Sequence, residues 1–145
     1  MKLTVGQYSV LALYVLAFAV GTTSHVVDIL RWGFFPHNRY HWSLNLFWTS
    51  LAFFDPLAIV LLLRRAKAGI LLAGLIMFLD VAVNLAAGVH EYLATGRFLM
   101  WGLYTQVPFA LFILATASSL WSAFGASRRT MQRTQGQDGA SPLIS

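Results

Sequence analysis

The chain has 145 residues, of which 58% are hydrophobic and only 10% are charged. This composition is too apolar for a soluble globular domain and predicts an integral membrane protein surrounded by membrane lipids. The sequence contains no cysteine, which excludes disulfides, thiol catalysis and cysteine-based metal sites. The net charge of +5 comes from residues between and after the apolar segments, so we expect no nucleic-acid partner.

Four apolar segments follow one another, at about residues 8–30, 43–63, 68–89 and 99–121. A helix rises about 1.5 Å per residue, so each segment is long enough to cross the ~30 Å core of a bilayer. The connection at residues 31–42 contains Gly33, Pro36 and several aromatic residues, which is typical of a chain lying at the headgroup level. We therefore predict an all-α fold, a four-helix transmembrane bundle formed by residues 1–124.

The first segment carries a polar pair, His25 and Asp28, near its end. In the second segment, polar and aromatic residues recur at intervals of four and three positions, which places them on one helix face. They are His41, Asn45, Trp48, Ala52 and Asp55. Pro56 directly follows the acid, and a proline inside a helix removes a backbone hydrogen bond and favours a local kink.

The third segment carries an acid where lipid is expected. Asp80 lies near the middle of residues 68–89, and Asn84 and Glu91 follow on the same helix face. A carboxyl at the centre of a bilayer costs about 2.5–3.5 kcal/mol on insertion scales. We therefore expect this face to line a protein interior or a wet cavity.

The fourth segment brings Trp101, Tyr104 and Pro108 onto one helix face, with Gln106 on a neighbouring face. From residue 125 onward the chain is rich in Gly, Ser, Thr, Gln and Arg and shows no apolar periodicity. We therefore predict a disordered, basic cytoplasmic tail over residues 125–145, with its arginines at anionic headgroups.

Basic residues are distributed unevenly between the two sides of the predicted bundle. One side carries Lys2, Arg64, Arg65, Lys67, Arg128, Arg129 and Arg133, and the other carries Arg31, Arg39 and Arg97. Because basic residues are enriched on the cytoplasmic side, we predict that both termini are cytoplasmic. The expected location is the bacterial inner membrane or, in a eukaryote, the membrane of the endoplasmic reticulum.

The polar groups of the four segments are expected at matching depths. Asp55 and Asp80 fall near mid-membrane, and the other polar groups lie toward the non-cytoplasmic side. These are His25, Asp28, Asn45, Asn84, His90, Glu91 and Gln106. The cytoplasmic half of every segment is almost purely apolar. This asymmetry predicts a polar cavity that opens away from the cytoplasm or sideways into the outer leaflet.

A packing role is the simpler explanation for a single intramembrane polar residue. Three acids on three helices are different, because their summed insertion cost is about 7–10 kcal/mol. No Lys or Arg lies in any of the four segments to neutralise them. The acids therefore predict a functional cavity that receives a cationic ligand, a proton or a metal ion.

Candidate roles follow from the residue types. The proposed catalytic residues are Asp80 and Asp55, which could donate a proton, and His25, which could accept one. The residues expected to bind the ligand are Asp28, Asn45, Trp48, Asn84, Trp101, Tyr104 and Gln106. A divalent metal at the rim would be held by His25, Asp28, His90 and Glu91. Their spacing matches no metal signature, so we assign no metal and no cofactor.

The layout resembles the EXPERA superfamily, which includes the emopamil-binding sterol isomerases and sigma-2 receptor type proteins. The resemblance rests on four spans with cytoplasmic termini, proline-containing helices and an acid-lined pocket. The local matches are Ser24-His25 with Asp28 and Pro36, Leu46-Phe47 with Asp55-Pro56, and the YTQVPF run at residues 104–109. The resemblance implies that Asp28 pairs with a ligand amine. The family's second-helix glutamate is replaced by Ser50 here, and its sterol isomerases usually have a fifth span.

The sequence therefore predicts a membrane protein that binds a small hydrophobic ligand, either an amine or a sterol-like or isoprenoid-like molecule. If the protein is an enzyme, these residues allow proton-shuffling isomerase chemistry. Two alternatives remain open. One is a proton-coupled small-molecule transporter, expected to be a homodimer. The other is an accessory subunit whose polar faces pair with another membrane protein.

Overall fold

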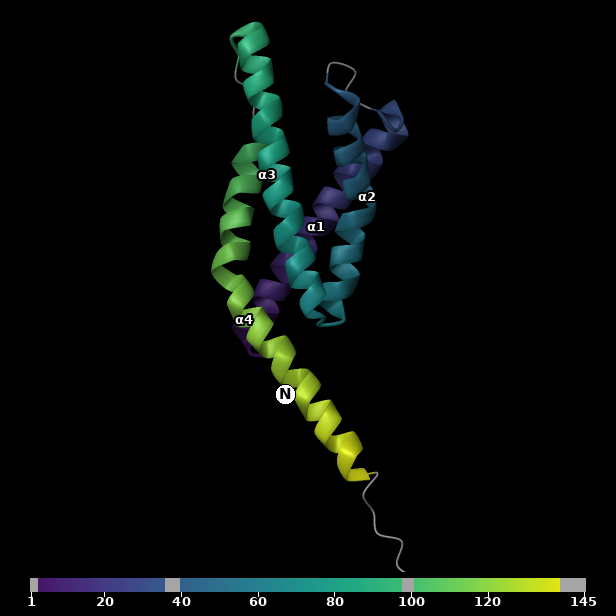
Figure 1. Cartoon of the computed structure of the whole chain (residues 1–145), viewed down its shortest axis with the longest axis vertical. Coiled ribbons are helices and arrows are strands. Elements are labelled where there is room, and N and C mark those ends of the chain that lie inside the picture. The colour runs from purple at the N-terminus through teal and green to yellow at the C-terminus, as the bar shows by residue number, and fades with distance from the viewer. Residues whose placement is uncertain (1–2, 36–39, 98–100, 139–145) are drawn as a thin grey trace, which may run out of the picture.

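The computed structural model describes residues 3–35, 40–97 and 101–138, with side chains described for residues 3–35, 40–97 and 102–125. These residues form the helices α1 (Val5–Trp32), α2 (Trp42–Leu63), α3 (Lys67–Thr95) and α4 (Trp101–Asp138), as shown in Figure 1. All four helices are long and apolar enough to cross a membrane, in α4 over Gly102–Gly125. The predicted all-α, four-helix transmembrane fold is confirmed, whereas the orientation of the termini stays a prediction.

Capping groups fix the ends of the helices. Thr4 forms a capping box with Gln7 at the start of α1, in which each side chain accepts a backbone hydrogen bond from the other residue. His41 accepts a backbone hydrogen bond at the start of α2. Gly33 and Gly96 follow α1 and α3 with φ of 81° and 71°, a backbone conformation that other residues rarely adopt. Compared with the predicted spans, α2 agrees to within one residue, α1 and α3 extend beyond theirs at both ends, and α4 begins at Trp101, inside its predicted span.

The helices pack as a ring. α1 packs against α2, α2 against α3 and α3 against α4, while α1 meets α4 over a shorter stretch. Within the described residues, neither diagonal pair is in close backbone contact. Figure 1 shows the ribbons diverging at the end away from the α2–α3 turn, α1 with α2 and α3 with α4. We call the end that carries this turn, at residues 64–66, the turn end, and the opposite end the loop end.

Close packing at the turn end holds the ring together. A Cβ at Gly69 would lie 2.7 Å from the backbone nitrogen of Leu62, so α3 approaches α2 backbone to backbone here. Arg65 donates a 3.0 Å hydrogen bond to the hydroxyl of Tyr8, which ties the turn to α1. The Nζ atom of Lys67 lies 4.5 Å from the ring centroid of Trp121, a cation–π contact that ties the start of α3 to α4.

The buried and exposed apolar residues divide as expected for a bundle in lipid. The inside of the ring holds the buried core, which includes Tyr14, Phe18, Leu51, Ala58, Leu62, Ala73, Ile113, Leu120 and Phe124. Large apolar side chains also cover the outside of all four helices, among them Leu16, Val20, Phe53, Phe78 and Leu114. An outer surface this apolar is suited to contact with a membrane rather than water.

The end of α4 differs from the prediction. We expected disorder from residue 125 onward, but the helix continues to Asp138 and extends past the turn end of the bundle (Figure 1). Extending an existing helix adds one hydrogen bond per residue without a new nucleation cost. Arg and Gln, which each occur three times in this stretch, also favour helix. Residues 139–145, the rest of the predicted tail, lie outside the described residues.

Candidate functional site

A cavity of about 370 Å³ lies inside the ring, and all four helices contribute to its wall. The lining residues are Ala17, Phe18, Val20, Gly21, Ser24, His25, Leu51, Asp55, Ile76, Met77, Asp80, Thr105, Gln106 and Phe109. Neither Lys nor Arg is among these described lining residues, whereas two carboxyl groups and one imidazole are. The cavity is therefore mostly apolar with an acidic polar patch.

Asp55 is the most buried acid of the site, with 3% of its surface exposed. The helix face predicted from the sequence turns it inward, since Asn45, Trp48 and Asp55 are all buried. Its Oδ2 lies against the backbone of α1, where a Cβ at Gly21 would come within 2.6 Å. Its Oδ1 is buried and has no hydrogen-bond partner among the described residues. Asp55 thus contributes a carboxyl group to the cavity wall, and one of its oxygens, Oδ1, is buried and unpaired.

Asp80 is the second buried acid, with 7% of its surface exposed. The side chain of Asn84, one turn later in α3, donates hydrogen bonds of 2.9 Å to Asp80 Oδ1 and 2.8 Å to the Asp80 carbonyl. Asp55 and Asp80 are close enough for their charges to repel each other. They lie about 12 Å and about 20 Å along their helices from the α2–α3 turn, at about 1.5 Å per residue. Adjacent helices thus place two acids on one cavity.

Four further polar residues line the cavity from α1 and α4, and two of them, Ser24 and Thr105, donate their hydroxyl groups to backbone carbonyls of their own helices. His25 lines the cavity from α1, and Gln106 lines it from α4. The Gln106 Oε1 atom is buried and has no hydrogen-bond partner among the described residues. The polar patch therefore combines carboxyl and amide oxygens from α2, α3 and α4 with one imidazole from α1.

Aromatic side chains close the cavity toward the turn end. Phe18 and Phe109 line the cavity and pack edge to face with ring centroids 5.7 Å apart. Behind them, Tyr14 packs against Phe109 and Phe112 at 6.0 and 5.8 Å. The fully buried Tyr14 hydroxyl lies 3.0 Å from the carbonyl oxygen of Ile113, to which it donates a hydrogen bond. We call Tyr14, Phe18, Phe109 and Phe112 the aromatic floor.

The cavity reaches the molecular surface at the edge shared by α1 and α4. Val20 and Ser24 of α1 and Thr105 of α4 line the cavity and are also exposed. Because α1 and α4 touch over only a short stretch, this edge is the least closely packed side of the ring. In a bilayer, the opening would face lipid at the depth of the acids.

The structure assembles part of the predicted site. Asp55, Asp80, His25 and Gln106, all expected from the sequence, line one cavity. Asn84 does not line it and instead holds Asp80. The prediction that the polar groups converge therefore agrees with the geometry for four residues, while their chemical roles stay predictions.

Other predicted ligand residues lie elsewhere. Asp28 is half-buried and does not line the cavity. Asn45 and Trp48 are buried nearer the loop end, where the Asn45 amide donates to the Tyr40 carbonyl and Trp48 packs against the Tyr40 ring. These contacts hold Tyr40 over the start of α2.

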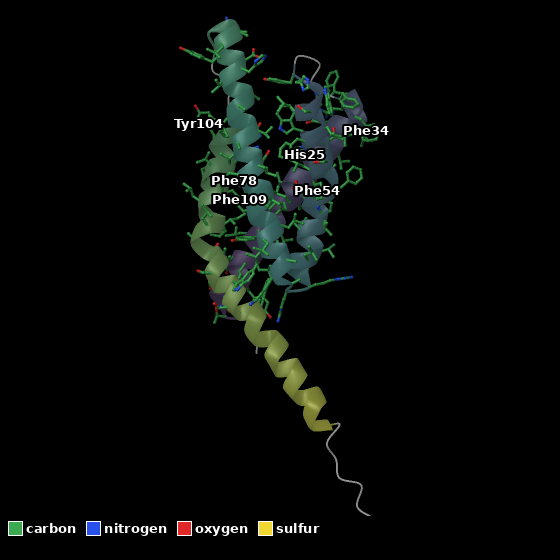
Figure 2. The ribbon with its side chains drawn as sticks, viewed as in Figure 1. His25, Phe34, Phe54, Phe78, Tyr104 and Phe109 are labelled. Carbon is green, nitrogen blue, oxygen red and sulfur yellow. The ribbon has the colours of Figure 1, made fainter. Side chains whose placement is uncertain are left out.

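The residues predicted for α4 lie on two faces of the helix, and of those with described side chains Gln106 lines the cavity whereas Tyr104 does not. Tyr104 is 77% exposed and lies on the outer side of the helix (Figure 2). Pro108 shares this exposed face, so the face that lines the cavity is the one with Gln106 and Phe109. Aromatic residues at helical spacing suit a lipid-facing surface as well as a pocket, which is why the pattern misled. The side chain of Trp101 lies outside the described side chains.

The alternative metal site at the rim is not assembled. Among the described residues, no three His, Asp or Glu side chains come together closely enough to hold a metal ion. His90 is exposed, whereas Glu91 is buried against its neighbours. The rim residues therefore do not form a single cluster.

Sequence reasoning overlooked Gly21 and the aromatic floor, although a signal for them was present. Tyr14, Phe18, Gly21 and His25 are spaced by four, three and four residues, the same inward-facing period that was recognised in α2. A glycine in a hydrophobic helix also marks a place where another group can approach the backbone.

The chain matches no protein-family model, no curated protein and no solved structure.

Proposed function

We propose that this protein binds a small hydrophobic molecule carrying a basic amine in the cavity between its four helices. One observation carries the proposal: Asp55 and Asp80 share a largely apolar cavity whose described lining contains no Lys or Arg. The coarser conclusion, that the four helices suit a multi-pass membrane protein, does not depend on it.

Electrostatics favour a cation at this site. A carboxylate removed from water loses several kcal/mol of solvation unless a partner replaces it. Asp80 receives two hydrogen-bonded contacts from Asn84, but Asp55 Oδ1 has no partner among the described residues. An ammonium group would supply both the charge and the hydrogen-bond donor that Asp55 lacks.

The rest of the cavity suits the apolar body of such a ligand. Its walls include Phe18, Leu51, Ile76, Met77 and Phe109, which offer aliphatic and aromatic contacts. The volume of about 370 Å³ lies at the lower end of the ~300–1,000 Å³ range of small-molecule sites. The opening between α1 and α4 would admit a ligand already dissolved in the membrane.

The resemblance to the EXPERA superfamily extends this proposal to proton transfer. Asp80 would protonate an alkene, and His25, which lines the same cavity, would take a proton from the resulting cation. Asp28, the residue that the resemblance assigned to the ligand amine, lies outside the cavity lining, so Asp55 takes that role in our proposal.

The geometry favours this function over proton-coupled transport. A carrier needs a polar route to each side of the membrane in turn. The aromatic floor closes the cavity toward the turn end, and Tyr14 within it is fully buried. Ligand binding requires no such route.

Thermal unfolding of the purified protein in detergent tests the proposal. Dodecylamine at neutral pH should stabilise the wild type, by ~2.7 kcal/mol when its free concentration is one hundred times its Kd. Dodecanol, which has the same chain without the charge, should not. The stabilisation should be lost in Asp55→Asn and Asp80→Asn.

Asp28→Asn is the matched control, because it removes an acid of the same bundle that does not line the cavity. It should retain the full response to dodecylamine. An equal response to dodecanol, or an unchanged amine response in Asp55→Asn and Asp80→Asn, would refute the proposal.

A further inference from the structure

We propose that the cavity selects primary ammonium groups over more highly substituted amines, because three of its helices each present an acceptor oxygen to the ligand. This inference rests on the proposed function and specifies the chemical class of its ligand. The inference depends on the unpaired hydrogen-bond acceptors of the cavity wall and not on the negative charge of the cavity.

Two acceptors on opposite helices have no donor. Asp55 Oδ1 on α2 and Gln106 Oε1 on α4 are both buried without a hydrogen-bond partner among the described residues, and both residues line the cavity. Buried polar atoms in native proteins nearly always have a partner, so two exceptions at one cavity require an explanation. A ligand that donates to both supplies it.

Asp80 offers the third acceptor, from α3. Its Oδ1 already accepts a hydrogen bond from Asn84, but a carboxylate can accept about four hydrogen bonds in total. Asp80 also lines the cavity and interacts electrostatically with Asp55. A cation bound between them would separate two like charges that otherwise repel.

A primary ammonium group matches this arrangement. It carries three N–H donors around one charge and no acceptor, so each of the three helices could receive one hydrogen bond. A secondary ammonium has two donors, a tertiary one has one, and a quaternary one has none. The apolar lining residues, including Phe18 and Phe109, would hold the single carbon substituent.

His25 also lines the cavity and is the only imidazole there among the described residues. An imidazole that carries one proton has a single acceptor nitrogen, which would add to the acceptors of the site and leave the preference for the amine with the most N–H donors unchanged. Gln106 is an uncharged oxygen acceptor, so it is the residue that distinguishes hydrogen bonding from charge alone.

The test uses four ligands of equal chain length: dodecylamine and its N-methyl, N,N-dimethyl and N,N,N-trimethyl derivatives. Their affinities for the purified wild-type protein are measured in the same detergent at neutral pH. We expect the Kd to rise by roughly tenfold for each lost hydrogen bond to a charged group. The trimethyl compound should bind weakest.

Gln106→Leu removes the neutral acceptor and keeps both acids. This change should raise the Kd of dodecylamine about tenfold and leave the Kd of the N,N-dimethyl compound unchanged. The difference in affinity between these two compounds should therefore become smaller. Val107→Leu, a change at the neighbouring exposed position of α4, is the matched control and should preserve the full series.

The outcomes separate this inference from the proposed function. Equal affinity for all four compounds would overturn the selection for primary ammonium and leave amine binding intact. Binding of none of them would overturn both. If NaCl displaces dodecylamine from the wild type but potassium and choline chloride do not, the oxygens form a sodium site, and the inference is also overturned. If Gln106→Leu fails to fold, the four Kd values measured with the wild-type protein still test the selection for primary ammonium groups.

Discussion

The Asp55 carboxyl rests directly on the backbone of α1 at Gly21, where a Cβ would lie 2.6 Å from Asp55 Oδ2. No other residue type leaves room for this contact, because even alanine would overlap the carboxylate oxygen. The glycine thus allows α1 and α2 to close over the acid.

Gly21→Ala should therefore change ligand binding more than stability. The Asp55 side chain can rotate away from the new methyl group, so the free energy of unfolding should fall by only about 1 kcal/mol, the low end of overpacking costs. The rotated carboxyl leaves its position at the cavity wall, and amine affinity should fall about tenfold, the loss expected for a charged hydrogen bond.

Gly74→Ala is the control, because a Cβ at that position of α3 meets nothing within 4 Å. It should preserve amine affinity and stabilise the helix by up to ~1 kcal/mol through the higher helix propensity of alanine. Chemical unfolding in detergent and amine titration measure both quantities. Unchanged amine affinity in Gly21→Ala would show that the Asp55 position is not fixed by this contact.

Gly69→Ala should damage the fold itself. A Cβ there would lie 2.7 Å from Leu62 N and 2.8 Å from Leu61 C, both of which are backbone atoms. Unlike a side chain, they can move only if α2 and α3 separate. We expect a loss of about 1–3 kcal/mol, the usual cost of overpacking, measured by the midpoint of unfolding. A midpoint equal to that of Gly74→Ala would contradict the close packing of the turn end.

The positions of the helices could be predicted because each apolar run exceeds the length of a bilayer core. The inward face of α2 was also predictable, because its polar residues are sparse and regular: Asn45 and Asp55 stand out against an apolar background and are buried. The same contrast identified Asp80. Because a polar group is costly in lipid, the helix face that carries it must turn toward the inside of the bundle.

The rest of the site could not be predicted in this way. Aromatic residues are stable both in lipid and in a core, so aromatic character alone does not distinguish the exposed Tyr104 from the buried Tyr14. Nor does spacing along one helix tell which parts of two helices meet. The contact of Gly21 with Asp55 depends on the crossing of α1 and α2, which only the packed structure shows.

Asn84→Leu should destabilise the protein through Asp80. The amide donates to both the carboxyl and the carbonyl of Asp80, at 2.9 and 2.8 Å, and its loss leaves a buried acid without that donor. We expect a loss of about 1–3 kcal/mol. In the double variant Asp80→Leu/Asn84→Leu most of this penalty should disappear, because no acid remains to be satisfied. Strictly additive effects in that double-mutant cycle would show that the pair is not coupled.

Tyr14→Phe should loosen the aromatic floor without changing amine affinity. The hydroxyl of this fully buried residue bonds to the Ile113 carbonyl at 3.0 Å and lies 2.9 Å from Thr116 Oγ1. Removing it should cost about 1 kcal/mol, the usual net value of one hydrogen bond, while the ring contacts with Phe109 and Phe112 persist. Amine affinity that falls as far as in Gly21→Ala would mean that the floor takes part in binding.

The orientation predicted from the basic residues can be measured directly, because the native chain has no cysteine. Ala68→Cys places a single thiol near the turn end, and Ala94→Cys places one near the loop end, both at exposed positions. In intact cells a membrane-impermeant maleimide should label Ala94→Cys at once, and Ala68→Cys only after lysis. The reason is that seven of the ten basic residues are predicted on the side of the bundle that carries residues 64–66, which the positive-inside rule places in the cytoplasm. The opposite labelling pattern would show that the loop end faces the cytoplasm and that the aromatic floor lies on the outer side of the cavity.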